Sequence, residues 1–422
     1  MRFKMFFCVV FLSSFLYPAG FALYEHSARA TGLAGAYAAT AEDPGALFYN
    51  PAGIAFQKYS FYLETTVIAP SSKFYGASPY PGEGVSEKMK SQYFFPSNFS
   101  LVAPLGKGFT FGVGMFNPFG LGTEWKNASQ FTGRYLSTKA DVRGYNFATA
   151  LAYKYQEKLG ISIGLHYFMA DLDLEQYVGA VNPYTQTYTN IGHVRMDGGR
   201  DGKLGYDFGL LYKFNSKWQA GLSYHSKTKV DFDGYAKFKQ IYTGYADFDA
   251  MVAQEFPAGK HPVETTIEFP TMAFIGISTT ALENFKFEFN LGWTQWSTYD
   301  QLSIEFVDNS ELNSTHYANW EDVYNYRLGI EYFYSEKISL RTGIVYDDTP
   351  QPNSNMNPML PDADRIGYCL GFGYKGKTMI FDIGYMFLSF KDRSTKGMQQ
   401  DGFNGLYENN AHLLGMSLTY NF

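Results

Sequence analysis

The chain is poor in charge, in cysteine and in long apolar runs. Charged residues make up 18% of its 422 residues, and there are two cysteines. Beyond the N-terminus we find no run of about 20 apolar residues, the length that a membrane-spanning helix needs, so a helical membrane protein is excluded. Cys8 falls in the leader described below, which leaves Cys369 without a partner for an internal disulfide. The formal net charge of -6 gives no reason to expect a nucleic acid partner.

Aromatic residues and glycine are abundant instead. Aromatics reach 19% of the chain, with 35 Tyr, 39 Phe and 42 Gly. This composition is typical of many β-strands that carry aromatic girdles and are joined by tight turns.

The N-terminus is the one apolar stretch. Arg2 and Lys4 precede an apolar run over residues 5–16, and small residues follow up to Ala22. This order predicts a secretory signal peptide over residues 1–22 that is cut after Ala22. The alternative is a single anchoring helix, for which the run is short.

The C-terminus shows a strict period of two. One face of the last strand is apolar, and the other face is small and mostly polar, as a tilted membrane-spanning strand requires. The apolar face consists of Leu414, Met416, Leu418, Tyr420 and Phe422. A strand that ends on a terminal Phe also resembles the signal that the barrel assembly machinery of bacterial outer membranes reads, so we expect Phe422 to contact that machinery.

The same alternation recurs in fourteen segments, and short connections alternate with long ones between them. Since only a closed sheet leaves no unpaired backbone in lipid, residues 59–422 are predicted to form a 14-stranded antiparallel transmembrane β-barrel, and we expect a monomer in the outer membrane. The expected strands are 59–69, 92–104, 109–117, 141–155, 159–174, 204–215, 218–230, 267–279, 284–296, 324–334, 338–347, 366–375, 378–390 and 411–422. The expected long loops are 70–91, 118–140, 175–203, 231–266, 297–323, 348–365 and 391–410.

Residues 23–58 do not alternate. They are rich in small residues and carry few charges, whereas a disordered tail would be more polar. We therefore expect a compact plug, or hatch, inside the lumen of the barrel. The alternative is a periplasmic extension.

Three motifs resemble the FadL family of outer-membrane transporters for hydrophobic compounds. The first is Glu-Asp-Pro-Gly-Ala-Leu-Phe-Tyr-Asn-Pro-Ala-Gly at 42–53, which is similar to the N-terminal hatch of that family. The second is the tryptophan-rich segment 291–299. The third is the strand at 340–350 together with the Pro-Asp-Ala-Asp-Arg motif that ends at Arg365. Loops 70–91 and 175–266 match no motif of the family.

The resemblance implies a function without an energy source, a cofactor or a metal. Long-chain fatty acids or other apolar molecules would be captured outside the cell and passed to an interior site. The hatch would then shift, and the ligand would leave sideways through a gap at an inward-kinked third strand. Lipids and lipopolysaccharide of the outer membrane would surround the barrel.

Two candidate sites follow for the interior of the barrel. The resemblance places Arg365 at the ligand site, where a guanidinium can pair with a carboxylate; the alternative is a salt bridge to Asp362 or Asp364 that shapes the loop. Gly112, Gly114 and Pro118 lie in or beside the third strand, where Gly and Pro often mark a break. We expect the lateral gap there, unless the glycines only make room for the plug.

Two further sites are expected in the hatch and at the mouth. Asn50, Pro51 and Ala52 are turn-forming or small residues, so we expect them to hold the hatch rather than to touch ligand. Phe248, Met251 and Val252 follow helical spacing within 245–256 and could form an outer capture groove. The alternative for this apolar stripe is packing on neighbouring loops.

The sequence does not favour three alternative functions. A general diffusion porin needs an open, charged lumen, and the expected inward charges are sparse. A lipid hydrolase needs a nucleophile beside a base, and although His166, His225, Ser162 and Ser223 share the lumen parity, the sequence has neither a Gly-x-Ser-x-Gly elbow nor a metal-ligand spacing. We therefore expect no enzyme. An adhesin would not need a plug.

Overall fold

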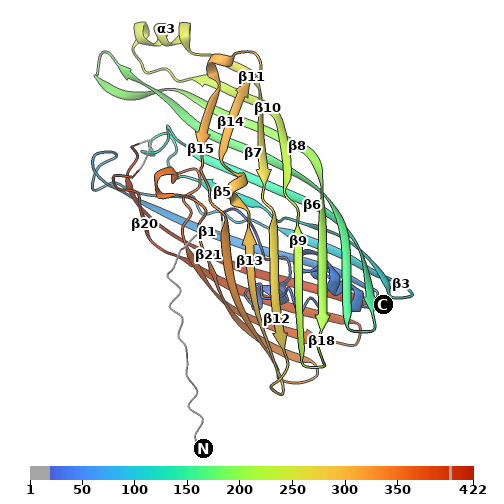
Figure 1. Ribbon diagram of the computed structural model, residues 1–422. Helices are drawn as coiled ribbons and strands as arrows, with labels where there is room; N and C mark the ends of the chain where they lie inside the picture. Colours follow the sequence, from blue (N-terminus) through green and yellow to red (C-terminus); the bar gives the residue numbers. More distant parts are fainter. Residues whose placement is uncertain (1–19, 399–401) are drawn as a thin grey trace, which may run out of the picture.

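A computed structural model describes residues 20–398 and 402–422 as an elongated barrel with strongly tilted strands (Figure 1). One antiparallel sheet closes on itself, because β1 pairs with β21 from Ser60–Asn421 to Gly76–Gly405. None of the helices in the described residues is long and apolar enough to cross a membrane.

Fourteen wall strands form the sheet, and four of them are interrupted into two named segments. The uninterrupted strands are β1 (Ser60–Gly76), β3 (Ser97–Gly106), β6 (Lys139–Tyr155), β7 (Leu159–Asn182), β8 (Thr187–Lys213), β16 (Val323–Phe333), β17 (Ile338–Asp347), β18 (Arg365–Lys375), β19 (Met379–Phe390) and β21 (Gly405–Asn421). The interrupted strands are β4 (Phe109–Phe116) with β5 (Gly120–Glu124), β9 (Trp218–His225) with β10 (Thr228–Gln240), β11 (Gly259–Phe269) with β12 (Met272–Thr279), and β13 (Phe285–Thr294) with β14 (Gln301–Phe306). The predicted fold is confirmed, and each predicted strand falls on an observed one.

Shorter elements lie at the ends of these strands. They are β2 (Ser86–Lys88), β15 (Ser314–Tyr317), β20 (Arg393–Ser394), the helix α3 (Ala246–Glu255) and the 3-10 turns η2 (Trp296–Thr298), η3 (Ser310–Leu312) and η4 (Asn353–Asn355). The predicted helix over 245–256 is therefore present, as α3.

The barrel is apolar outside and more polar inside. On β7 the outward Ile163 and Leu165 are 65% and 58% exposed, whereas the inward Ser162 and His166 are 1% and 4% exposed. A soluble sandwich would have the reverse order, so the exposed apolar face is the lipid-facing surface.

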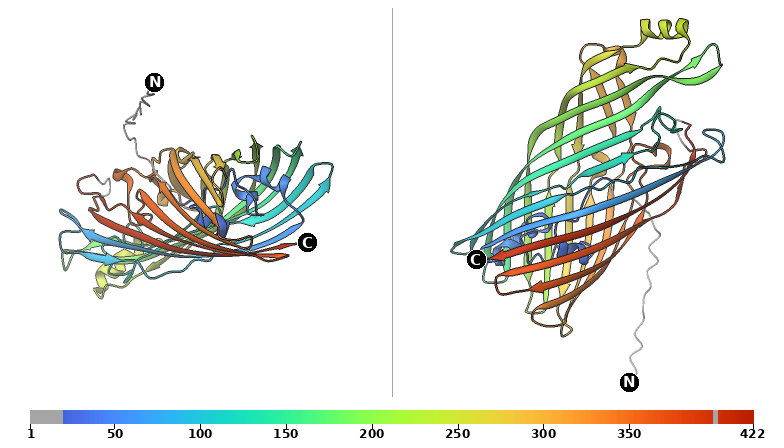
Figure 2. Two further views of the ribbon diagram at one scale, coloured as in Figure 1. Left: turned by 90° about the horizontal axis from the view of Figure 1, so that it is seen from below. Right: turned by 180° about the vertical axis from the view of Figure 1, so that it is seen from behind.

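The prediction of long loops at 175–203 and 231–266 is wrong. Strands β7 and β8 are 24 and 27 residues long and meet in a tip at residues 183–186, while β10 and β11 continue beside them up to α3. These strands project well beyond the rest of the rim (Figure 2). The projection is held by a small apolar cluster on the facing strands, which comprises Val194, Ala236, Val263 and Phe306. Because these residues are far apart in the chain, period-two alternation along the sequence does not reveal their contacts.

The segment before β1 lies inside the barrel, toward the end opposite α3 (Figure 2). It comprises α1 (Ala28–Gly32), α2 (Ala46–Tyr49) and η1 (Pro51–Phe56), and it is almost entirely buried. Small residues allow this close fit: an added Cβ on Gly32 would lie 2.9 Å from the backbone of Gly371 in the wall. The predicted hatch is thus present inside the lumen.

The predicted signal peptide, residues 1–22, overlaps the first described residues. Residues 1–19 of the expected signal peptide lie outside the described part of the chain. Residues 20–22, which the expected cut after Ala22 would remove, are buried inside the barrel.

Candidate functional site

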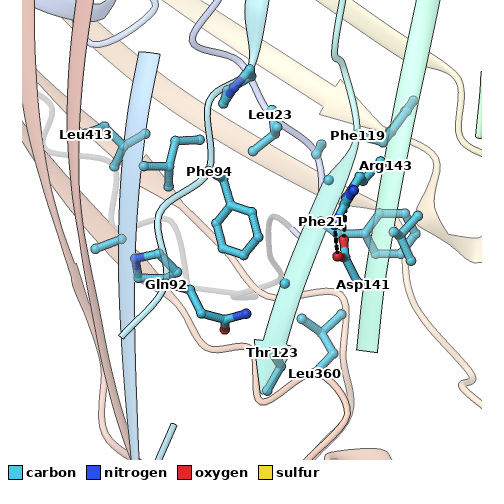
Figure 3. A pocket seen from close by; sticks show the side chains of 18 of the residues that line it. Phe21, Leu23, Gln92, Phe94, Phe119, Thr123, Asp141, Arg143, Leu360 and Leu413 are labelled. Carbon is cyan, nitrogen blue, oxygen red and sulfur yellow. Dashed lines mark hydrogen bonds and ion pairs between the residues drawn. The ribbon is translucent and has the colours of Figure 1, made fainter. Parts of the chain in front are cut away.

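A cavity of about 830 Å³ lies between the N-terminal end of the hatch and the wall (Figure 3). This volume is within the usual range for a site that holds a small apolar molecule. Its lining comes from residues 20–23 and Glu25, from β1, β6, β19 and β21, and from the segments 89–97, 117–124 and 360–365. We call this cavity the chamber.

Arg365 lines the polar end of the chamber and pairs with Asp347, the last residue of β17, which does not itself line the chamber. The two carboxylate oxygens of Asp347 accept hydrogen bonds from Arg327 Nη2 and from Arg365 Nε, each at 3.1 Å. Arg365 also lies over the ring of Phe390, with 5.6 Å from Cζ to the ring centroid. Its two Nη atoms have no hydrogen-bond partner among the described residues, so they can receive a ligand group in the chamber.

Arg365 therefore lies at the chamber, and its partner is Asp347 rather than Asp362 or Asp364. Asp364 instead lies 3.7 Å from Lys391 Nζ. Asp362 accepts hydrogen bonds from the Thr349 hydroxyl at 2.6 Å and from the backbone N–H of Gly20 at 3.1 Å. Burial raises the pKa of the Asp362 carboxyl, and Arg365 opposes that shift.

The wall beside the chamber is interrupted between β4 and β5. Both segments pair with β6, and residues 117–119 separate them. On its other edge β4 pairs with β3. The end of β5 meets the neighbouring segment at the bridge Met89–Trp125, where Lys90 N–H donates to Glu124 O at 2.7 Å and Lys126 N–H donates to Lys88 O at 3.1 Å. Between these contacts no backbone hydrogen bond joins residues 91–96 to residues 120–123, all of which are described. The hydrogen-bonded ladder of the wall is therefore open at this place.

The hatch supplies the hydrogen bonds that the interrupted strand lacks. Leu23 N–H donates to Pro118 O at 2.8 Å, and Gly120 N–H donates to Phe21 O at 3.0 Å. Ala22 and Phe119 form an antiparallel bridge between these two bonds. Residues 21–23 thus act as a short extra strand on the inner side of the break.

An aromatic cluster holds this short strand. The ring of Phe21 meets those of Trp296 at 4.6 Å, Trp320 at 5.6 Å and Phe269 at 6.1 Å. Phe119 packs on the same cluster, with its ring 5.1 Å from that of Phe269. The contacts of this segment with the wall are therefore mostly apolar.

Phe94, which the sequence analysis missed, fills the place where the ladder is open. Its backbone exchanges two hydrogen bonds of 2.9 Å with Ile68 of β1, and its ring points into the chamber (Figure 3). The ring lies against Gly122 of β5, where an added Cβ would come 1.9 Å from the ring. Gly122 is thus the signal that something bulky faces β5, but the sequence does not say what.

The three residues expected at the gap fall into two places. Pro118 lies in the break itself. Gly112 and Gly114 lie in the regularly paired part of β4, and an added Cβ on Gly112 would meet Leu47 and Ile54 of the hatch at 2.7 and 2.9 Å. The structure therefore supports the alternative for Gly112, namely that it makes room for the plug.

Asn50 fixes the hatch to itself and to the wall. Its side-chain Nδ2 donates to Ala38 O at 2.7 Å and to Leu210 O of β8 at 3.0 Å, while its Oδ1 accepts from Ala52 N–H at 3.1 Å. The last contact caps η1, which begins with Pro51. These three residues do not line the chamber.

The helix α3 lies far from the chamber, at the tip of the projecting strands (Figure 1). Phe248 and Val252 face inward and are 3% and 7% exposed, whereas Met251 is 52% exposed. None of the three lines the chamber. Packing on the neighbouring chain accounts for Phe248 and Val252, and only Met251 offers a free apolar surface.

Charged groups fasten the body of the hatch to the wall. Arg29 Nη2 lies 2.6 Å from Glu331 Oε2, and the other oxygen of Glu331 accepts from Arg341 Nε at 2.7 Å. The carboxylate of Glu288 accepts the backbone N–H groups of Ala39 and Thr40 at 2.8 and 2.7 Å. The hatch from Arg29 onward is therefore held by buried polar contacts as well as by packing.

The residues that suggested a hydrolase form a different cluster. His166 Nδ1 and His225 Nδ1 both lie near Asp207 Oδ1, at 3.0 and 2.7 Å. In the described part of the chain no group of three or more His, Cys, Asp or Glu side chains is arranged to hold a metal ion.

The comparisons with known proteins agree with this architecture. The family model described as outer membrane protein transport protein (OMPP1/FadL/TodX) matches residues 9–422. The long-chain fatty acid transport protein of Escherichia coli (strain K12) is 24% identical over 444 residues, which covers 98% of this chain and 97% of that protein. Outer membrane protein P1 of Haemophilus influenzae is 25% identical over 392 residues, which covers 85% of this chain and 81% of that protein.

Two solved structures share the fold. A Pseudomonas aeruginosa FadL homologue matches with a TM-score of 0.84 at 19% identity, covering 96% of this chain and all 100% of the other. The Pseudomonas putida toluene transporter TodX matches with a TM-score of 0.68 at 19% identity, covering 90% and 94% of the two chains. The chain therefore belongs to the OMPP1/FadL/TodX family, and it is an outer-membrane transporter of hydrophobic compounds rather than an enzyme.

Proposed function

We propose that this chain carries apolar molecules inward by passive binding in the chamber, a shift of residues 20–25, and lateral release through the break between β4 and β5. The single observation that carries the proposal is the chamber itself, because it touches both the N-terminal end of the hatch and the interrupted wall. Apolar cargo gains about 0.8 kcal/mol for each methylene that it buries, so binding needs no energy source.

The contrast between the two parts of the hatch supports a local shift. Residues 20–25 form no ion pair with any described residue, and their contacts with the wall are apolar apart from a few hydrogen bonds and the Arg327 guanidinium over the ring of Tyr24. The hatch from Arg29 onward is held by ion pairs and carboxylate contacts. A ligand can therefore displace the first part while the second stays in place.

The cargo proposed for this chain is a long-chain fatty acid or another apolar molecule. One relative is named as a long-chain fatty acid transport protein, and one structural neighbour as a toluene transporter. In this chain the free Nη atoms of Arg365 offer a place for a carboxylate or another polar end group. Met251 on α3 offers a first apolar contact at the mouth.

The decisive experiment narrows the lateral opening without touching the polar end. Gly122→Leu places a side chain where Phe94 now lies, so uptake of a radiolabelled apolar compound by cells should fall by about tenfold, whereas binding to purified protein should fall by less than uptake does, although Gly122 also lines the chamber. Val113→Leu on the outward side of β4 is the matched control. Unchanged uptake by a correctly assembled Gly122→Leu barrel would refute lateral release at this place.

A further inference from the structure

Glu25 is a buried carboxyl group without a cationic partner at the polar end of the chamber. It is 8% exposed, it lines the chamber together with Arg365, and its one hydrogen bond comes from the backbone N–H of Tyr24 at 3.1 Å. None of the salt bridges among the described residues includes Glu25. Buried carboxylates normally have such a partner, so this one requires an explanation.

When Glu25 is ionised, its charge and the charges around it sum to zero without a ligand. Arg327 and Arg365 share the single carboxylate of Asp347, so this trio carries one positive charge. Among the charged groups, Arg365 acts most strongly on Glu25. An ionised Glu25 neutralises the trio, whereas a protonated Glu25 leaves one positive charge available for an anion.

Asp362 does not change this balance. It also lines the chamber, but it lies beside a second arginine, Arg393, whose Nη1 donates to the carbonyl oxygen of Asp362 at 2.9 Å. Arg365 acts more strongly than Arg393 on the Asp362 carboxyl, but counted together Asp362 and Arg393 add no net charge to the chamber.

We propose that Glu25 is an internal counter-ion that competes with anionic cargo for Arg365. The chamber then accepts neutral apolar molecules at any pH, whereas a carboxylate binds only when Glu25 has taken up a proton. This inference rests on the proposed function, since it assigns a charge preference to the same chamber. It makes Glu25 a specificity-determining residue.

The other titratable groups near Glu25 are not available as competing counter-ions. On its own segment, burial lowers the pKa of His26 to about 4 and raises that of Tyr24 to about 12, so both are neutral between pH 6 and pH 9. Burial likewise raises the pKa of Glu25 itself, and Arg365 opposes the shift. The groups that face Glu25 from other elements are Tyr49, Glu64, Arg327, Asp347, Arg365 and Cys369. Of the two acids in that set, Glu64 does not line the chamber and Asp347 is held by two arginines.

The test compares dodecanoate with 1-dodecanol on the full mature protein in lipid nanodiscs. Calorimetry in phosphate and in Tris buffer gives the number of protons taken up on binding. We expect about one proton for dodecanoate above the pKa of Glu25 and none for dodecanol. Dodecanoate affinity should then fall by about tenfold per pH unit up to pH 9, while dodecanol affinity stays level.

Glu25→Gln should remove this difference. The variant should bind dodecanoate with no pH dependence and at least about tenfold more tightly than the parent at pH 9, and dodecanol as before. Glu336→Gln, on the exposed turn between β16 and β17 and outside the chamber, is the control and should keep the parent profile.

Two results would overturn the inference in different ways. If both probes bind but dodecanoate takes up no proton, or if Glu25→Gln keeps the parent profile, Glu25 is not the competing group and the chamber remains the cargo site. If neither probe binds to the parent or to any variant, the chamber is not the cargo site, and the proposed function fails together with this inference.

Discussion

At the scale of single residues, the lateral release that we propose depends on one side chain. Phe94 lies between β1 and β5 and fills the place where the ladder is open. Its neighbour Phe95 is 63% exposed and has no such role. The two adjacent aromatics therefore form a natural pair for an experiment.

We predict that Phe94→Ala speeds transfer of apolar cargo through the wall. Removing the ring leaves a gap lined by Gly122, so the rate of uptake of a radiolabelled apolar compound should rise by about threefold or more when release limits transport. Phe95→Ala should match the parent in the same uptake assay. A Phe94→Ala variant that folds normally but transports at the parent rate, or more slowly, would contradict a gating role for the ring.

Phe21 also bears on where the predicted signal peptide ends. Phe21 is 6% exposed, and burial of a Phe side chain stabilises a fold by about 1.5–3 kcal/mol. A cut after Ala22 would remove this ring and the bridge to Phe119. We therefore predict that the mature chain begins at or before Gly20, which N-terminal sequencing and the intact mass of the purified protein will check. A mature chain that begins at Leu23 would disprove it.

At the scale of elements, the hatch is fastened by a few buried charges. Glu331 of β16 connects Arg29 of α1 to Arg341 of β17. Breaking a buried pair on one side costs about 3–5 kcal/mol because it leaves an uncompensated charge.

We predict that Glu331→Gln loosens the hatch while the barrel stays closed. Hydrogen exchange of residues 28–40, followed by mass spectrometry, should become at least about 100-fold faster, in line with that energy. Exchange in the β1–β21 ladder should not change. Glu336→Gln, on the exposed turn between β16 and β17, is the control. Equal protection of residues 28–40 in both variants would show that packing alone holds the hatch.

The elements also show what a sequence can predict. Period-two alternation located all fourteen wall strands, because one face meets lipid along the whole length of each span. It failed for the projecting parts of β7, β8, β10 and β11, which leave the membrane and so no longer need a strictly apolar face. Pro118 and Arg365 could be singled out in the sequence because a break and a motif mark them within the chain.

The remaining site residues have no such mark. The chamber is assembled over long distances: the bond from Gly20 to Asp362 spans 342 positions. Neither Glu25 nor Phe94 belongs to a motif, and their roles follow only from what lies opposite them, namely Arg365 and Gly122. Periodicity cannot supply such pairings.

At the scale of the whole molecule, a closed barrel holds its own N-terminal segment as a stopper. The ladder between β1 and β21 closes without any residue of the hatch. The wall can therefore fold around an empty bore, whose inner face carries polar groups such as Glu288, Arg327 and Asp382. An empty bore is expected of a porin, whereas a filled bore is expected of a transporter that releases cargo through its wall.

We predict that the mature protein carries little ion current in planar bilayers, and that deletion of residues 23–57 produces large, steady openings. The hatch from Ala28 to Phe56 fills the bore, so removing it exposes a polar, water-filled lumen. The Glu336→Gln variant should conduct as little as the parent. Large steady currents through the parent would instead favour a general diffusion porin, and a silent deletion variant with an intact β-sheet spectrum would mean that other segments, such as 348–364, also close the bore.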